Sequence, residues 1–159
     1  GRLDSVQIGG LTIIDDSYNA NPLSMKLGLD TLAGSLAPGG RRIAVLGTMA
    51  ELGPLSRQYH QQIGRYARQC AEQVIGVGEM GRHYAPDHWF TDSDACAQAI
   101  GTVVSPGDTL LIKGSASTGM SKIRQQLEQD AGANAQGRPS GDVATFAART
   151  RRRRSQRSQ

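Results

Sequence analysis

The sequence lacks the features that mark several classes of protein. No apolar run approaches the roughly 20 residues of a membrane-spanning helix, and no signal peptide opens the chain. Cys70 and Cys96 are the only cysteines, and their spacing fits neither a zinc site nor a redox pair. We therefore expect both thiols to pack in the core. We also expect a cytoplasmic protein with no membrane partner and no metal site of its own.

Two further absences concern ATPases and nucleic acids. The pattern GxxxxGK(S/T), by which many ATPases hold phosphate, occurs nowhere in the chain. The formal net charge is +4, but residues 131–159 contain seven arginines and only one acid, Asp142. Residues 1–130 therefore carry a net charge of −2. A basic fold that binds nucleic acid is not expected from this distribution.

Short apolar runs alternate with stretches of helical spacing from residue 11 to about residue 130. The predicted strands cover residues 11–14, 42–47, 73–78, 88–90 and 109–114, and the predicted helices cover residues 22–36, 55–71, 93–104 and 119–130. Strands that are apolar throughout are typical of parallel sheets buried on both faces. The sequence therefore predicts an α/β fold, namely a Rossmann-like, doubly wound, mostly parallel sheet of five or six strands with helices on both faces.

The composition changes at Ala131, which divides the chain into a domain of residues 1–130 and a tail of residues 131–159. The tail is rich in Ala, Gly, Ser and Arg, and Phe146 is its one aromatic residue, so we expect it to be disordered. The Arg151–Arg154 run could contact RNA, a lipid or another protein, or it could be a solvated extension. We favour the extension, because blocks of like charge are usually tails.

Polar clusters follow the carboxyl ends of predicted strands, where the ligand site of a doubly wound sheet lies. The first cluster runs from Asp15 to Asn21 and ends at a helix start. Helix N-termini favour phosphates, and a carboxylate such as Asp16 can bind a ribose hydroxyl or an ammonium group, or reach a phosphate through Mg²⁺. Asp16, Ser17 and Asn19 could instead only cap the turn. The cluster exceeds what one cap requires, so we favour a binding role.

Two more clusters follow later strands. In residues 47–54, GTMAELGP, Glu51 could orient a bound amine together with His60, or it could be an exposed turn residue. In residues 113–120, KGSASTGM, Lys113 and the hydroxyl groups after it form an anion site suited to a carboxylate or a phosphate. Lys113 precedes its glycine-containing loop, so this segment is not a P-loop.

These segments together resemble the Mur ligases, and most closely the member that adds D-alanyl-D-alanine to a UDP-muramoyl-tripeptide. The resemblance rests on DDSYNANP after an apolar strand, VLGxMxELG after the next, a histidine nine residues past that glutamate, and GDxLLxKGS near the end. The motifs follow the family's order over about residues 1–128, and DDSYNANP is the most specific of them. The resemblance implies the C-terminal, Rossmann-like domain of such a ligase.

The resemblance also implies a mechanism. In this family ATP phosphorylates the terminal carboxylate of the nucleotide substrate, the incoming amine attacks the acyl phosphate, and the C-terminal domain closes over the site. No residue of this domain is assigned a certain catalytic role. The implied binding residues are Asp16 at the ATP ribose, Tyr18, Asn19 and Asn21 between ATP and the dipeptide, Lys113 and Ser115 near the dipeptide carboxylate, and Glu51 and His60 beside the same cleft.

The chain departs from the family pattern at two positions and in its extent. Thr48 stands where the family usually has an acid, and Ala116 stands where a basic or polar residue is common. The 159 residues include no segment that resembles the family's UDP-binding domain or the central domain that binds most of the ATP and Mg²⁺. We interpret the chain as a cut domain, a split-gene product or a remnant. Its expected partners are the missing N-terminal and central ligase domains.

Two hypotheses about function follow. In the first, the chain is the closing domain of an amide-forming ligase and contributes contacts to ATP and D-alanyl-D-alanine. In the second, it is a non-catalytic Rossmann-like module that binds a nucleotide or a peptide. The intact DDSYNANP and KGS segments favour the ligase, whereas the missing P-loop favours the binding module. Both hypotheses predict that the chain alone neither hydrolyses ATP nor forms an amide bond.

Overall fold

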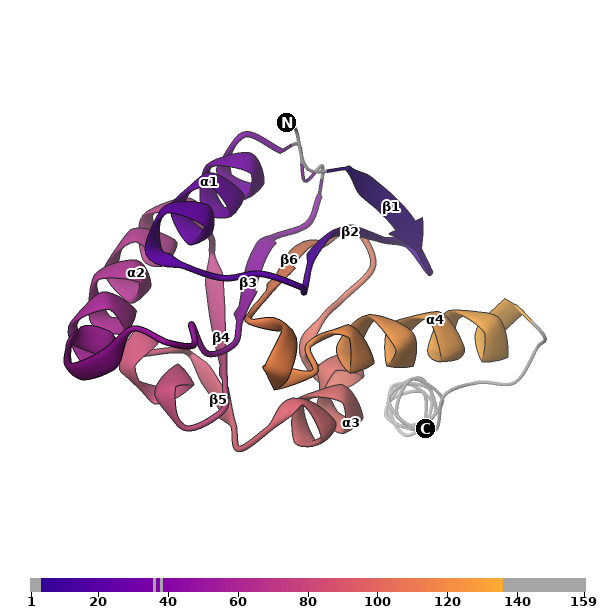
Figure 1. Ribbon diagram of the computed structural model, residues 1–159. Coiled ribbons are helices and arrows are strands. Elements are labelled where there is room, and N and C mark those ends of the chain that lie inside the picture. The colour runs from indigo at the N-terminus through magenta and orange to yellow at the C-terminus, as the bar shows by residue number, and fades with distance from the viewer. Residues whose placement is uncertain (1–3, 36, 38, 136–159) are drawn as a thin grey trace, which may run out of the picture.

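The computed structural model describes residues 4–35, 37 and 39–135 of the chain (Figure 1). The strands are β1 (Ser5–Ile8), β2 (Leu11–Asp16), β3 (Arg42–Leu46), β4 (Gln73–Val77), β5 (His88–Phe90) and β6 (Thr109–Lys113). The helices are α1 (Pro22–Ala33), α2 (Ser56–Cys70), α3 (Ser93–Val103) and α4 (Ser121–Ala135), with short 3-10 helices η1 (Gly53–Leu55), η2 (Met80–Tyr84) and η3 (Ala116–Thr118).

The strands form one sheet in the order β1-β2-β6-β3-β4-β5. β1 pairs antiparallel with β2, and every other neighbouring pair is parallel. Helices α1 and α2 pack against one face, and α3 and α4 pack against the other (Figure 1). This arrangement confirms the predicted doubly wound α/β fold.

Both faces of the sheet are buried, which explains the continuous apolar runs of the strands. Successive strand residues point to opposite faces. Ile13 and Leu110 therefore lie in the core beneath α3 and α4, while Ile14 and Leu111 lie in the core beneath α1 and α2. The two cysteines are buried and free, one in each core, so the prediction that they serve packing is confirmed.

The sequence analysis missed the first strand, β1. Its turn to β2 consists of Gly9 and Gly10, whose φ angles of +55° and +82° are left-handed. Two such glycines favour a tight hairpin, because this backbone conformation carries little steric penalty without a Cβ atom. A Gly-Gly pair between Ser5–Ile8 and Leu11–Asp16 was therefore the available signal.

Two helix ends also differ from the prediction. The first helix ends at Ala33 rather than near Leu36, with Gly34 as its C-cap. The last helix continues to Ala135, five residues past the expected end at residue 130. Ala131 packs against the hydrophobic core, and this contact favours helix where composition alone suggested a tail. The rest of the expected tail lies outside the described residues. No helix among residues 4–135 that the structure describes is long and apolar enough to span a bilayer.

Candidate functional site

Three loops meet at one edge of the sheet and form a cleft of about 470 Å³. They follow β2, β6 and β3, which are neighbours in the sheet and run parallel, so their carboxyl ends share an edge. The cleft is lined by Tyr18, Asn19, Ala20, Asn21, Ala50, Glu51, Leu52, Ser115, Ala116 and Ser117. The fold thus unites residues from three sequence clusters that were each expected to bind ligand.

Ser115 joins the three loops through hydrogen bonds. Its backbone N–H donates to the carbonyl of Thr48 at 3.0 Å, and its Oγ accepts from the backbone N–H of Ala50 at 2.8 Å. The same hydroxyl lies 3.4 Å from the carbonyl oxygen of Ala20. Because its hydroxyl already bonds to the backbone, Ser115 shapes the cleft as well as lining it.

Lys113 lies beneath the cleft rather than in it. Its side chain is fully buried, and its ammonium group forms an ion pair with Asp16 and donates to the carbonyl of Asn19 at 2.8 Å. Lys113 was expected near a dipeptide carboxylate and Asp16 near a ribose, but the structure brings the two side chains together. The Asp16 carboxylate remains one-quarter exposed, whereas Lys113 is shielded. Direct contact of Lys113 with a ligand would therefore require this pair to open.

The loop after β2 ends in a capping box. The Asn21 side chain accepts from the backbone N–H of Ser24 at 2.8 Å, and the Ser24 hydroxyl accepts from the backbone N–H of Asn21 at 2.9 Å. Asn21, and not Asp16, Ser17 or Asn19, is therefore the cap of α1. The side chains of Tyr18 and Asn19 are exposed at the cleft. The Ser17 hydroxyl, in contrast, is buried and lacks a hydrogen-bond partner among the described residues.

Glu51 projects from the loop after β3 and is the only charged residue among those that line the cleft. Its φ angle of +62° is left-handed, which costs a non-glycine residue roughly 1–2 kcal/mol. The fold holds Glu51 in this conformation with its side chain exposed at the cleft. Such strain at a cleft favours a functional role over that of a simple turn residue.

His60, by contrast, does not line the cleft. Its ring is fully buried, with Nε2 accepting from the backbone N–H of Met49 at 3.0 Å and Nδ1 donating to the carbonyl of Ser56 at 2.7 Å. Burial lowers the pKa of His60 from its usual value, although the bond to Ser56 opposes this shift. The expectation that His60 orients a bound amine directly is thus not met by the geometry. The neutral ring instead anchors the loop that carries Glu51.

Tyr84 anchors the same loop and was missed by the sequence analysis. Its buried hydroxyl donates to the carbonyl of Gly47 at 2.6 Å, and its ring lies 5.1 Å from that of His60, between centroids. Gly64 of α2 allows this approach, because a Cβ atom there would lie 2.2 Å from the Tyr84 carbonyl oxygen. Tyr84 lies far along the chain from the loop it holds, so no local pattern pointed to it.

The cleft can offer hydrogen bonds and one carboxylate, but none of its lining residues is basic. Within the described part of the chain, no group of three or more His, Cys, Asp or Glu side chains could hold a metal ion. This chemistry fits neutral polar groups and an ammonium group. It does not by itself neutralise a triphosphate.

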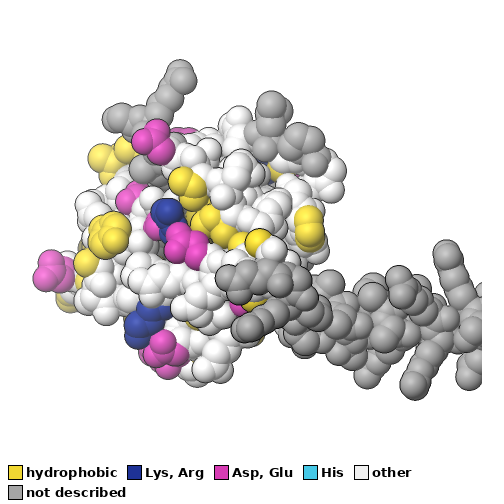
Figure 2. Space-filling view, turned by 90° about the vertical axis from the view of Figure 1, so that its right-hand side faces the viewer, with side chains coloured by type: hydrophobic (Ala, Val, Ile, Leu, Met, Phe, Trp, Pro, Cys, Tyr) yellow, Lys and Arg dark blue, Asp and Glu magenta, His cyan; other side chains and the backbone are white. Residues whose placement is uncertain are grey.

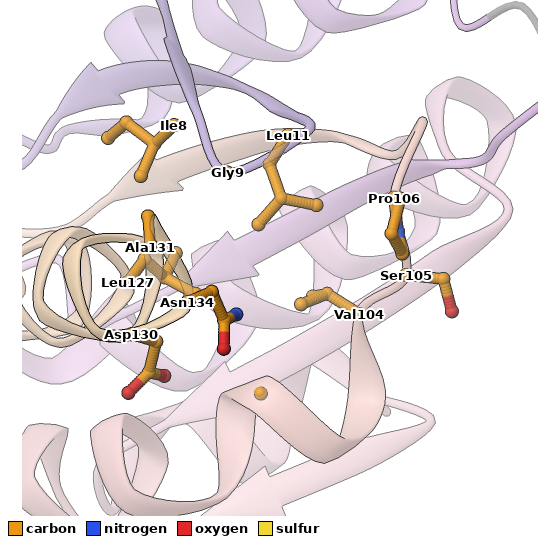
Figure 3. A pocket seen from close by; sticks show the side chains of 11 residues that line it. Ile8, Gly9, Leu11, Val104, Ser105, Pro106, Leu127, Asp130, Ala131 and Asn134 are labelled. Carbon is orange, nitrogen blue, oxygen red and sulfur yellow. The ribbon is translucent and has the colours of Figure 1, made fainter. Parts of the chain in front are cut away.

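A second pocket lies at the opposite edge of the sheet, between the β1–β2 turn, α3 and α4 (Figure 3). Its walls are largely apolar, with Ile8, Leu11, Val104 and Leu127 pointing inward, and Asp130 is its only charged residue. Hydrophobic side chains also gather on the side of the molecule that bears β1 and α4 (Figure 2). No predicted site residue lies in this pocket, so we place the candidate site at the carboxyl edge.

The sequence profile of the family described as "Mur ligase, glutamate ligase domain" matches residues 1–116. The chain is 38% identical over 148 residues to a UDP-N-acetylmuramoyl-tripeptide--D-alanyl-D-alanine ligase of Mycobacterium leprae, covering 76% of this chain and 28% of that protein. It is 33% identical over 140 residues to the ligase of the same name from Synechocystis, and the match covers 80% of this chain and 30% of that protein. The chain therefore spans about 30% of the length of these relatives.

Solved structures show the same likeness. A MurF ligase from Thermotoga maritima in complex with ADP matches with a TM-score of 0.72 and 24% identity, over 84% of this chain and 32% of that one. MurF from Acinetobacter baumannii matches with a TM-score of 0.70 and 27% identity, over 81% of this chain and 30% of that one. A bifunctional folylpolyglutamate synthase/dihydrofolate synthase, solved with Mn, AMPPNP and L-glutamate, shares the fold at a TM-score of 0.53 and 15% identity.

Proposed function

Because the chain belongs to the Mur ligase family, we propose that it acts in peptidoglycan synthesis as the C-terminal domain of an ATP-dependent ligase that joins D-alanyl-D-alanine to a UDP-muramoyl-tripeptide. Relatives that bear this name match about four-fifths of the chain. The reaction would take place in the cytoplasm, together with the N-terminal and central domains of the ligase.

The observation that supports this proposal most strongly is the convergence of three motif-bearing loops on one cleft. The loop after β2 carries DDSYNANP, the loop after β3 carries Glu51, and the loop after β6 carries KGS. A scaffold without a ligand has no need to bind these loops to one another through Ser115 and Lys113. A structure that does so holds its polar groups in place before ligand arrives, which reduces the ordering cost of binding.

Each side of the cleft suits a different part of the substrates. Tyr18 and Asn19 would offer an aromatic ring and an amide to the base and ribose of ATP, and the partly exposed Asp16, which lies next to the cleft but not in its lining, would add a carboxylate. Glu51 offers a carboxylate to the ammonium group of the dipeptide. A carboxylate at this place would hold the amine until it loses a proton and attacks the acyl phosphate. Ser115 would face the dipeptide from the third loop.

The triphosphate and its Mg²⁺ would be held mainly by the central domain. Mg²⁺ prefers several oxygen ligands, whereas among the residues that line this cleft Glu51 is the only carboxylate. The chain's own part is to orient the ribose and the amine and to exclude water as the domains close. The same lack of basic side chains fits the alternative of a non-catalytic nucleotide- or peptide-binding module.

A reconstitution distinguishes the two functions. The chain would be mixed with a fragment of the Synechocystis ligase from which the segment matching this chain is deleted, and phosphate release would be measured with ATP, the UDP-muramoyl-tripeptide and D-alanyl-D-alanine. We expect release only when all components are present, and none from the chain alone. Asn19→Ala should raise the KM of the mixture for ATP. Binding of the two proteins without dipeptide-dependent release would instead support the non-catalytic module.

A further inference from the structure

The apolar pocket at the opposite edge of the sheet takes no part in the proposed ligase site, yet its size and walls suit one apolar group (Figure 3). Its volume is about 140 Å³, and apolar protein cavities of about 150 Å³ take up benzene. Ile8, Leu11, Val104 and Leu127 point into it, and none of the residues that line it is aromatic or basic. The pocket therefore has room for a single phenyl ring.

The walls of this pocket are held together by contacts within the fold. The backbone N–H of Gly107 donates to the carbonyl of Gly10 at 2.8 Å, which ties the turn before β6 to the β1–β2 hairpin. The hairpin also lies against α4, because a Cβ atom at Gly9 would be 3.0 Å from the Cβ of Ala131. The pocket is thus formed before anything binds, and little ordering of its walls is needed on binding.

The chain itself supplies an aromatic side chain close to this pocket. Asn134 lines the pocket, and α4 ends one residue later. Ten residues, 136–145, then separate α4 from Phe146, the only aromatic residue that follows the helix. Such a segment spans up to about 35 Å when extended, and this one contains two glycines and a proline, which favour turns. Phe146 is therefore within reach of the pocket.

Charge also favours this segment as the occupant. Asp130 is the only charged residue that lines the pocket, and residues 1–130 carry a net charge of −2. Six arginines follow Phe146, and the first of them, Arg149, is three residues away. A ring in the pocket would bring this basic segment next to Asp130, so that electrostatic attraction adds to the burial of the ring.

We propose that the apolar pocket is the docking site of Phe146, whose ring inserts between the β1–β2 hairpin, α3 and α4 while the arginines after it lie toward Asp130. The short tether keeps the ring at a high effective concentration near the pocket, so the contact forms within one chain rather than between two. Burial of the ring favours the docked state by roughly tenfold to a hundredfold, and ordering of the tether offsets part of this gain.

Methyl NMR of the full chain tests this docking, with Phe146→Ala as the variant and Thr145→Ala as the matched control. Because no lining residue is aromatic, NOEs from a phenyl ring to the methyl groups of Leu11, Val104 and Leu127 report a ring that enters from outside the pocket. We expect these NOEs in the wild type and in Thr145→Ala, and we expect Phe146→Ala to lose them. The methyl signals of the pocket should shift together with that loss.

The core on the other face of the sheet serves as an internal reference. The methyl signals of Ile14 and Leu111, which lie in that core, should stay in place in both variants. Absence of the NOEs in the wild type, or their persistence in Phe146→Ala, overturns the docking. NOEs that arise only between a labelled and an unlabelled copy of the chain also overturn it, because the pocket would then hold the ring of a second molecule.

Discussion

The ion pair between Lys113 and Asp16 lies beneath the cleft and joins the ends of β6 and β2. Lys113 is fully buried, and its ammonium group satisfies both the Asp16 carboxylate and the Asn19 carbonyl. A buried charge persists only when it is paired, so each partner holds the other in place. The pair fixes the loop after β2 to the end of β6. Lys113 is therefore a positioning residue in this structure.

A double-mutant cycle tests this role. Lys113→Met leaves the Asp16 carboxylate and the Asn19 carbonyl without their donor, and Asp16→Leu leaves a buried ammonium group unpaired. Each change should lower the free energy of unfolding by about 3 kcal/mol or more. The free energy of unfolding of the double variant should fall by less than the sum of the two single losses, and the difference should be at least about 1 kcal/mol in urea unfolding. Additive losses would show that the two side chains act independently.

Tyr84 gives a second prediction at the scale of one residue. Tyr84→Phe removes the hydroxyl that donates to the buried Gly47 carbonyl but keeps the ring. We expect the free energy of unfolding to fall by about 1–3 kcal/mol, because that carbonyl would lose its partner. Tyr59→Phe is the control, since Tyr59 is only half-buried, and it should change stability by far less. A Tyr84→Phe protein as stable as the wild type would contradict the anchoring role.

At the scale of the element, the loop after β3 holds Glu51 in a left-handed conformation at the cleft. Glu51→Gly removes the steric strain of a Cβ atom at a left-handed φ of +62°. It should therefore raise the free energy of unfolding by up to about 1 kcal/mol. Glu51→Gln keeps the Cβ atom and should leave stability unchanged. Both variants should raise the KM for D-alanyl-D-alanine in the reconstituted ligase, because both remove the carboxylate. A wild-type KM for D-alanyl-D-alanine in Glu51→Gln would show that Glu51 is only a turn residue.

The turn between α3 and β6 is the element that fixes the opposite edge of the sheet. Burial raises the pKa of Asp108, but hydrogen bonds from the Arg41 side chain and from the N–H groups of Ser105 and Arg41 outweigh it and hold the pKa below the usual 3.8. A depressed folded pKa adds stability above the unfolded value. This stability is lost as the pH falls below about 3.8 through the folded value.

Asp108→Asn should therefore be less stable than the wild type by about 1–3 kcal/mol at pH 7, as urea unfolding would measure. The difference should shrink once the pH falls below about 4, because the carboxyl of the unfolded chain then gains a proton before the folded one does, and the folded carboxyl loses its charge-assisted bonds at still lower pH. The exposed Asp94→Asn serves as the control and should show little difference at either pH. A gap between Asp108→Asn and the wild type that stays constant down to pH 3 would refute the assignment.

For the whole molecule, the sequence predicted most of the fold because its signals are local. Buried parallel strands are apolar throughout, and the turns between them carry Gly, Pro and Asp, as around Thr109–Lys113. Asp92 directly precedes the helix predicted from residue 93, and it caps that helix by accepting from the backbone N–H of Ala95. β1 was missed because a strand of four residues, two of them polar, has a weak pattern of its own. The extension of α4 depends on tertiary packing of Ala131, which composition does not reveal.

The candidate site was predictable in place but not in detail. The order of the clusters along the chain, together with a parallel sheet, was enough to bring Asn19, Glu51 and Ser115 to one edge. The roles of Lys113 and His60 depend on burial, and burial is decided by which strand and helix pack over them. A polar residue in a loop motif reads the same from sequence whether it faces the ligand or supports the loop from below.

The central proposal is that the three-loop cleft, rather than the apolar pocket at the opposite edge of the sheet, receives the substrates of the ligase. The most direct test is chemical-shift mapping of the ¹⁵N-labelled chain assembled with the unlabelled Synechocystis fragment, before and after addition of an ATP analogue and D-alanyl-D-alanine. We predict that the shifts concentrate in residues 16–21, 48–52 and 114–118. Shifts concentrated instead around Leu11, Val104 and Leu127, in the pocket at the opposite edge, would contradict the claim.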